Sequence, residues 1–317
     1  MLRLSVHGPY RRSYVSRWWS VAAVVVSAAC FGTLAVLTPL AYEAGAEPLP
    51  LLAWRFVIAA ALLFSVAAVR DRDALRVPTA DIGRYALLAL TGYGAASVCF
   101  FYALTFADAS VVAVLLYAYP ALVTLVGWFT GLERPSWAKG IAVAVTFVGC
   151  ALVVGLIGSA PTAAWQGIAL GLGAAVGYTL FNLLSHRWLP GRSRLVMMGW
   201  TFGLAALLPI AGSLIAGGVG ALSPAAWEPA VWWLLAAIVL IPTFAAIVLY
   251  LEGIRGLGPS QAAVLSTLEP LFTIALAAVI LGERLHPSQY LGAALVLAGV
   301  VFAEVGARSE LAVPAPS

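Results

Sequence analysis

Ten long apolar runs follow one another along the chain. The first extends from about Ser20 to Thr38 and stops before Pro39, and the others cover about 49–69, 82–103, 108–129, 137–157, 166–186, 195–216, 230–252, 259–281 and 288–305. Each has about the length that an α-helix needs to cross the hydrocarbon core of a bilayer, roughly 20 residues. The runs therefore predict an all-α integral membrane protein with ten transmembrane helices.

The composition excludes a sizeable water-facing domain. Hydrophobic residues make up 63% of the 317 residues and charged residues only 9%, against roughly 25% charged in an average soluble protein. The runs show no alternation with a period of two, so they predict helices rather than barrel strands. The basic residues form short clusters between the runs instead of one stripe, so we expect no nucleic acid partner.

The positions of the basic residues predict how the chain crosses the membrane. If successive runs cross in alternation, fifteen of the 17 Lys and Arg residues fall on the side of the N-terminus. Only Arg284 falls on the other side, and Arg55 lies within a span. Basic residues accumulate on the cytoplasmic side, so we predict a multi-pass protein of the cell membrane with cytoplasmic tails at 1–18 and 307–317.

The two halves of the chain repeat each other. Two offsets, of 150 and 146 residues, pair Ser110 with Ser260, Pro120 with Pro270, Glu133-Arg134 with Glu283-Arg284, and Trp54-Arg55-Phe56 with Trp200-Thr201-Phe202. We predict a five-helix repeat at 19–157 and another at 166–306. An odd number of spans inverts the second copy in the membrane, as in many secondary transporters with a substrate site near the midplane. Duplication could also serve only to build a large stable bundle.

Two short motifs resemble those of a known family. Leu268-Glu269-Pro270-Leu271 is followed by Leu281-Gly282-Glu283-Arg284-Leu285, with an echo in Tyr119-Pro120-Ala121-Leu122 and Gly131-Leu132-Glu133-Arg134. This pattern resembles the EamA family of the drug/metabolite transporter superfamily, and the resemblance covers about residues 20 to 305. It implies ten helices in two EamA repeats and the export or exchange of small organic molecules.

Arg55 is the only basic residue that lies away from the ends of a predicted span. A charge there costs a few kcal/mol, so the side chain should face protein or water and have a partner. A guanidinium can grip an anionic group, such as a substrate carboxylate, at two points. The alternative is a structural arginine that pairs with Glu43, Glu47 or a backbone carbonyl.

Glu269 precedes Pro270 inside the ninth span and is a candidate proton-coupling residue, because an acid in an apolar span is rarely without a role. Ser266 and Thr273 share its helix face by their spacing of three and four residues. The alternative is a glutamate that bonds only to backbone groups freed by the proline.

Polar residues in otherwise apolar helices either line a cavity or bridge helices by hydrogen bonds. The candidate substrate-binding set that we predict comprises Arg55, Tyr93, Ser97, Tyr117, Tyr178, Asn182, Thr243, Ser266 and Glu269.

No motif in the chain indicates a metal, a cofactor or ATP. Cys30, Cys99 and Cys150 lie inside apolar runs without a CxxC pair, and no phosphate loop is present. We therefore expect a secondary transporter rather than an enzyme, with a small-molecule substrate and the lipid bilayer as its partners. The sequence indicates no particular oligomeric state. The alternative is a membrane-embedded enzyme that acts on a lipid-linked or apolar substrate.

Overall fold

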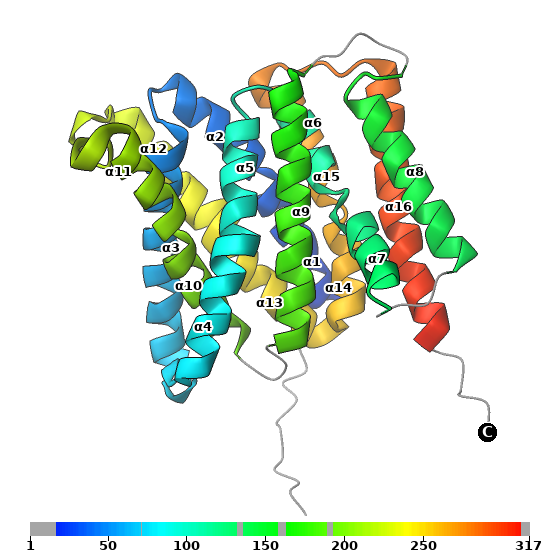
Figure 1. The fold of residues 1–317 in the computed structure, drawn as a ribbon, viewed down its shortest axis with the longest axis horizontal. Coiled ribbons are helices and arrows are strands. Elements are labelled where there is room, and N and C mark those ends of the chain that lie inside the picture. The colour runs from blue at the N-terminus through cyan, green and yellow to red at the C-terminus, as the bar shows by residue number, and fades with distance from the viewer. Residues whose placement is uncertain (1–16, 71, 132–135, 158–162, 189–192, 312–317) are drawn as a thin grey trace, which may run out of the picture.

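The computed structural model describes residues 17–70, 72–131, 136–157, 163–188 and 193–311. Every regular element in these ranges is a helix (Figure 1). Eight segments are long and apolar enough to cross a membrane: Arg17–Glu43, Pro48–Arg70, Thr79–Ala103, Ala109–Phe129, Trp165–Ser185, Arg194–Ala221, Pro229–Leu257 and Gln261–Leu281. Two further apolar helices, Lys139–Val153 and Pro287–Phe302, are shorter. The all-helical membrane class is confirmed, whereas the number of ten spans stays a prediction.

Among the described residues, the first half of the chain contains eight α-helices. They are α1 (Arg17–Gly32), α2 (Leu34–Glu43), α3 (Pro48–Arg70), α4 (Thr79–Leu87), α5 (Ala95–Ala103), α6 (Ala109–Leu116), α7 (Tyr119–Phe129) and α8 (Trp137–Val153). A π-helical segment, Leu88–Gly94, joins α4 to α5. The first span was predicted to end at Pro39, but it continues to Glu43. The residues after the proline remain helical, and Ala41 among them is fully buried. Glu133 and Arg134 lie outside the described residues.

The second half also contains eight α-helices. They are α9 (Trp165–Trp188), α10 (Arg194–Ala205), α11 (Leu207–Ala221), α12 (Pro229–Ile238), α13 (Ala246–Leu257), α14 (Pro259–Ser266), α15 (Glu269–Leu276) and α16 (Pro287–Leu311). π-helical segments follow α12, at Val239–Ala245, and α15, at Ala277–Leu281. Helix α16 continues to Leu311, into the region predicted as the C-terminal tail.

Irregular features recur at equivalent places in both halves. One span breaks between α6 and α7, and the span 150 residues later breaks between α14 and α15 at the matching positions. Pro120 and Pro270 are the second residues of α7 and α15. In the first turn of a helix an N–H group has no partner inside the helix, so proline is tolerated there. The π-helical segments Leu88–Gly94 and Val239–Ala245 also correspond. The repeat is therefore a feature of the backbone as well as of the sequence.

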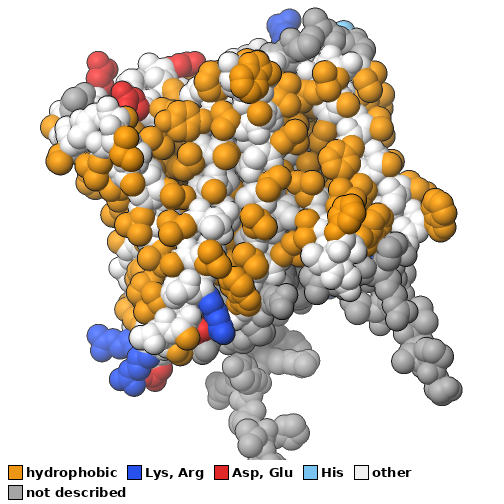
Figure 2. Space-filling view, in the orientation of Figure 1, with side chains coloured by type: hydrophobic (Ala, Val, Ile, Leu, Met, Phe, Trp, Pro, Cys, Tyr) orange, Lys and Arg blue, Asp and Glu red, His pale blue; other side chains and the backbone are white. Residues whose placement is uncertain are grey.

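The outer surface of the bundle is apolar. Figure 2 shows hydrophobic side chains along its flanks and charged ones near its two ends. Phe129 and Trp137 are 88% and 92% exposed, which suits contact with lipid chains rather than water. Helices α8 and α16 pack on each other at one edge (Figure 1). A side chain at Gly149 or Gly292 would collide there with the backbone of the other helix.

Glu283 links the two halves at one end of the bundle. Its carboxylate accepts hydrogen bonds from the backbone N–H groups of Ala109 and Ser110, at 2.7 and 3.1 Å, and from the Ser110 hydroxyl at 2.6 Å. The carboxylate thus caps the N-terminus of α6, where helices favour negative charge. Gly282, with a φ of 70° that suits glycine, turns the chain toward this contact. Burial and then the Glu283 charge raise the pKa of the neighbouring Asp108 carboxyl.

We predict that Glu283→Ala lowers the stability of the protein by about 1–3 kcal/mol, because the mutation leaves partly buried donors of α6 without an acceptor. The measurement is thermal unfolding of the purified protein in detergent. Arg284→Ala is the matched control, since Arg284 is exposed and should change the midpoint little. Equal losses for both variants would show that Glu283 is not a specific link.

Candidate functional site

A small cavity of about 80 Å³ lies between segments of both repeats. It brings together five of the predicted candidates, namely Arg55, Tyr93, Ser97, Tyr178 and Glu269. The rest of its lining is mostly apolar and includes Phe31, Leu34, Phe100, Phe101 and Leu116, with Thr273 as a further polar residue. We call this space the central cavity.

Arg55 is held by groups from both repeats. Its side chain is only 2% exposed, and its Nε donates a hydrogen bond of 2.9 Å to Oγ1 of Thr243. The guanidinium carbon lies 5.4 Å from the ring centroids of both Phe56 and Phe101, within the range of cation–π attraction. Tyr93 also interacts with the guanidinium. The pairing with Glu43 or Glu47 that we considered is not observed, although the structure describes both residues.

Two polar partners of Arg55 lie in π-helical segments. Tyr93 belongs to Leu88–Gly94 and Thr243 to Val239–Ala245, so each segment provides one polar side chain. The Thr243 hydroxyl donates to the carbonyl of Ile238, five residues earlier, at 2.8 Å. Its lone pairs remain available to accept from Arg55. Single π-helical turns occur frequently at functional sites.

Glu269 is the first residue of α15 and reaches the central cavity from the second repeat. The hydroxyl of Tyr117 lies 3.0 Å from its Oε2 and 2.9 Å from the carbonyl oxygen of Ser266. A hydroxyl has one proton, so at any moment it donates to only one of these two acceptors. Tyr117 is buried behind Glu269 and does not itself line the cavity.

A close helix crossing fixes the position of Glu269. The Thr273 hydroxyl lies 3.2 Å from the carbonyl oxygen of Gly32 in α1. A Cβ atom at Gly32 would lie 3.1 Å from the Glu269 carbonyl oxygen and the Thr273 backbone nitrogen. Glycine at this point therefore allows α15 to approach α1 closely enough to aim Glu269 at the cavity.

Aromatic rings form a continuous wall beside the charged residues. The Tyr93 ring lies 5.2 Å from Phe202 and 5.4 Å from Phe181. Tyr178 contacts Phe181 at 6.0 Å and Tyr119 at 4.8 Å. These separations are typical of aromatic pairs, so the wall offers a flat apolar surface next to two charged groups.

Three other candidates lie away from the cavity lining. Asn182 donates to the carbonyl of Tyr178, and the Ser266 hydroxyl donates to the carbonyl of Ala262, each within its own helix. Thr243 accepts a hydrogen bond from Arg55 but does not line the cavity. The apolar lining was not predicted, because Phe100 and Phe101 carry no polar group that distinguishes them in an apolar chain. Thr273 was predicted to share a helix face with Glu269 but was not among the candidates.

Comparison of the sequence with known families identifies the family of this chain. A sequence profile of the EamA-like transporter family matches residues 18–155 and again residues 165–304. The chain belongs to the EamA-like transporter family. It contains two copies of the EamA unit, one in each half, and it is a multi-pass membrane protein.

Individual relatives agree with the EamA assignment. YcbK of Bacillus subtilis (strain 168), named an uncharacterized transporter, is 29% identical over 287 residues, which cover 85% of this chain and 87% of that protein. YwfM of the same organism, also named an uncharacterized transporter, is 28% identical over 201 residues, or 60% of this chain and 62% of that protein. An uncharacterized transporter of Archaeoglobus fulgidus is 27% identical and covers 89% of this chain and 95% of its own length.

A known crystal structure has a similar fold. It superposes with a TM-score of 0.63 over 93% of this chain and 99% of that chain, at 20% sequence identity. At this identity the similarity concerns the fold alone.

We predict that Thr243→Val lowers stability by about 1.5–3 kcal/mol, because it removes an uncharged partner of a buried guanidinium without changing side-chain shape much. The measurement is thermal unfolding in detergent. Thr124→Val is the matched control, since Thr124 is also buried but its hydroxyl bonds only to Pro120 in its own helix. If both variants lowered the stability equally, the hydrogen bond between Thr243 and Arg55 would contribute no more than a bond within one helix.

Proposed function

We propose that this membrane protein is a secondary transporter that exports or exchanges a small organic metabolite, such as an amino acid, by alternating access between its two repeats. The observation that carries this proposal is the placement of Arg55 and Glu269 around one cavity, one from each repeat. In secondary transporters with repeated halves, substrate sites lie between those halves.

The two charged groups suit a zwitterion. Arg55 and Glu269 form no ion pair with each other in the described chain, so neither neutralises the other directly. A substrate carboxylate could bind the guanidinium, and a substrate ammonium could bind the Glu269 carboxylate. Tyr93 and Tyr178 would contact the apolar part of the substrate.

The size of the cavity supports a mechanism with moving halves. Pockets for small ligands typically enclose about 300–1,000 Å³, whereas this cavity measures about 80 Å³. A metabolite can therefore enter only after helices on one side separate. Two repeats at about 19–157 and 166–306, with the second inverted, could exchange conformations and open the cavity to each side in turn.

Glu269 and Tyr117 suggest how a proton could take part. When Glu269 is ionised, its Oε2 competes with the Ser266 carbonyl for the single Tyr117 proton. When Glu269 is protonated, it becomes a hydrogen-bond donor itself, and Tyr117 is free to donate to Ser266. Protonation would thus change the contact between α6 and α14, so Glu269 is our proposed proton-coupling residue.

The proposed location is the cell membrane, with both termini in the cytoplasm. The support is the concentration of basic residues on one set of connections.

The proposal predicts saturable, protein-dependent flux in proteoliposomes that are screened with a pool of amino acids and small metabolites, with and without a pH gradient. We expect Glu269→Gln to abolish the dependence on the pH gradient, because glutamine cannot exchange a proton. We expect Arg55→Lys to weaken substrate affinity about tenfold, because lysine cannot make the paired contacts of a guanidinium.

Glu43→Gln is the matched control, since Glu43 is an exposed carboxylate at the end of α2. It should leave flux unchanged. Absence of flux from folded protein would contradict transport of the screened solutes. Full dependence on pH in Glu269→Gln would exclude Glu269 as the coupling residue, and unchanged affinity in Arg55→Lys would remove Arg55 from substrate recognition.

A further inference from the structure

A second pocket, of about 480 Å³, opens at the end of the bundle where α3 ends and α10 begins. Its charged lining consists of Arg70, Arg194, Arg255 and Glu252. Helix α13 contributes apolar residues, Val248, Leu251 and Ile254. None of these residues lines the central cavity. We call this space the arginine pocket.

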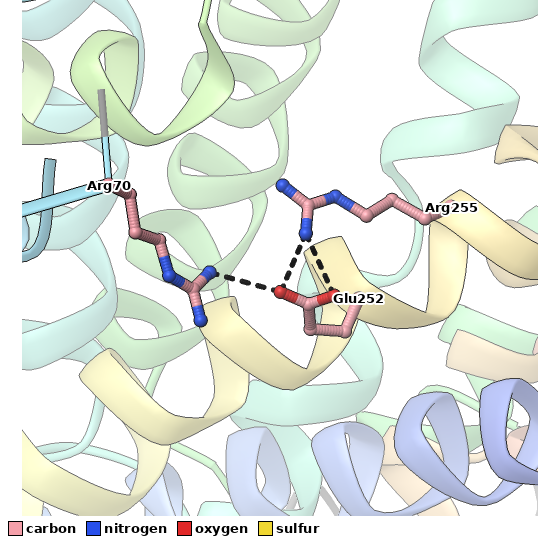
Figure 3. A network of polar contacts seen from close by, with 3 residues as sticks. All are labelled: Arg70, Glu252 and Arg255. Carbon is pink, nitrogen blue, oxygen red and sulfur yellow. Dashed lines mark hydrogen bonds and ion pairs between the residues drawn. The ribbon is translucent and has the colours of Figure 1, made fainter. Parts of the chain in front are cut away.

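Positive charge dominates the arginine pocket. Glu252 accepts from Arg70 at 3.0 Å through Oε1 and from one nitrogen of Arg255 at 2.9 Å through both oxygens (Figure 3). A single carboxylate is therefore shared by two guanidiniums, and a third guanidinium, that of Arg194, lines the same pocket. Arg194 makes no ion pair or side-chain hydrogen bond within the described ranges, so its donors are available to a ligand.

The start of α10 adds backbone donors to this positive charge. Ser193 precedes the helix without a capping hydrogen bond from its side chain, and both Ser193 and Leu195 line the pocket. The first N–H groups of a helix have no partner inside the helix, and they favour an anion. Arginine forks match the oxygen geometry of a phosphate group.

The apolar part of the lining indicates what accompanies the phosphate. Val248 and Leu251 precede Glu252 and Arg255 on α13, toward the membrane interior, and Ile254 lies between the two charged residues. A free phosphate would leave these side chains uncovered. A phospholipid places a phosphate at the level of the span ends and acyl carbons directly below it.

We propose that the arginine pocket binds the headgroup phosphate of an anionic phospholipid, with the first acyl carbons against α13. Arg194 contacts the phosphate directly, and Arg70 and Arg255 contribute charge that Glu252 partly neutralises. The site is separate from the central cavity, so it does not depend on the nature of the transported substrate.

The test is the thermal midpoint of the full-length protein in detergent, titrated with phosphatidylglycerol, phosphatidylcholine or glycerol 3-phosphate. A ligand that binds the folded state raises the midpoint in a saturable manner. We expect phosphatidylglycerol to do so, and the other two probes to have little effect at the same concentration.

Four variants locate the effect. Arg194→Gln should weaken the apparent affinity for phosphatidylglycerol about fivefold, whereas Arg194→Lys should retain most of it. Glu252→Gln should tighten binding, because it removes the carboxylate that neutralises two arginines. Arg76→Gln is the control: Arg76 pairs only with the exposed Asp73 in the described chain and does not line the pocket.

Several results would overturn the proposal. Equal midpoint shifts with phosphatidylcholine would mean that the arginine pocket binds acyl chains without regard to the charge of the headgroup. Equal shifts with glycerol 3-phosphate would mean a site for soluble phosphates. Equal weakening by Arg194→Gln and Arg76→Gln would mean diffuse attraction to the basic end of the bundle. If Arg194→Gln does not fold, unchanged affinity in Glu252→Gln would contradict the proposal by itself.

Discussion

A guanidinium buried among apolar helices needs partners, and the centre of this bundle provides them. Arg55 is almost completely buried, where an unpaired charge costs several kcal/mol. Thr243 supplies an acceptor, and Phe56 and Phe101 supply ring faces. These groups belong to α3, α5 and the π-helical segment after α12. Satisfying one charge therefore fixes the relative positions of three spans, and the central cavity is what remains between them.

The duplicated backbone and the distribution of charge follow different rules. The helix breaks and π-helical segments recur at equivalent places in both repeats. The two charges of the central cavity do not recur, because the offsets of 146 and 150 place Thr201 opposite Arg55 and Tyr119 opposite Glu269. The two halves thus provide backbones with similar irregularities, but Arg55 and Glu269 make the charge of the central cavity asymmetric.

The sequence predicted the fold better than the site. Length and hydropathy identify membrane helices because backbone N–H and C=O groups inside a bilayer must form their hydrogen bonds within the protein, which favours helices. The repeat is visible as matched prolines and Glu-Arg steps. Arg55 and Glu269 stood out because charges are rare in spans. Thr243 and Tyr117 were also among the predicted candidates, but not as the partners of these charges: Thr243 lies 188 residues from Arg55 in the chain. A π-helical turn also shifts the face on which later residues lie, so α-helical spacing cannot place Thr243.

Polar contacts join the two repeats at opposite ends of the bundle, and they differ in strength. At the start of α6, the partly buried Glu283 carboxylate accepts three hydrogen bonds, and bonds to an ionised acceptor are stronger than bonds between neutral groups. At the end of α3, the pair of Arg70 and Glu252 is exposed by 50% and 28%, and exposed pairs contribute about 0–1 kcal/mol. The polar contact between the repeats at the Arg70 end is therefore the weaker of the two. The arginine pocket lies at the same end, and its lining comes from α3 in the first repeat and from α10 and α13 in the second.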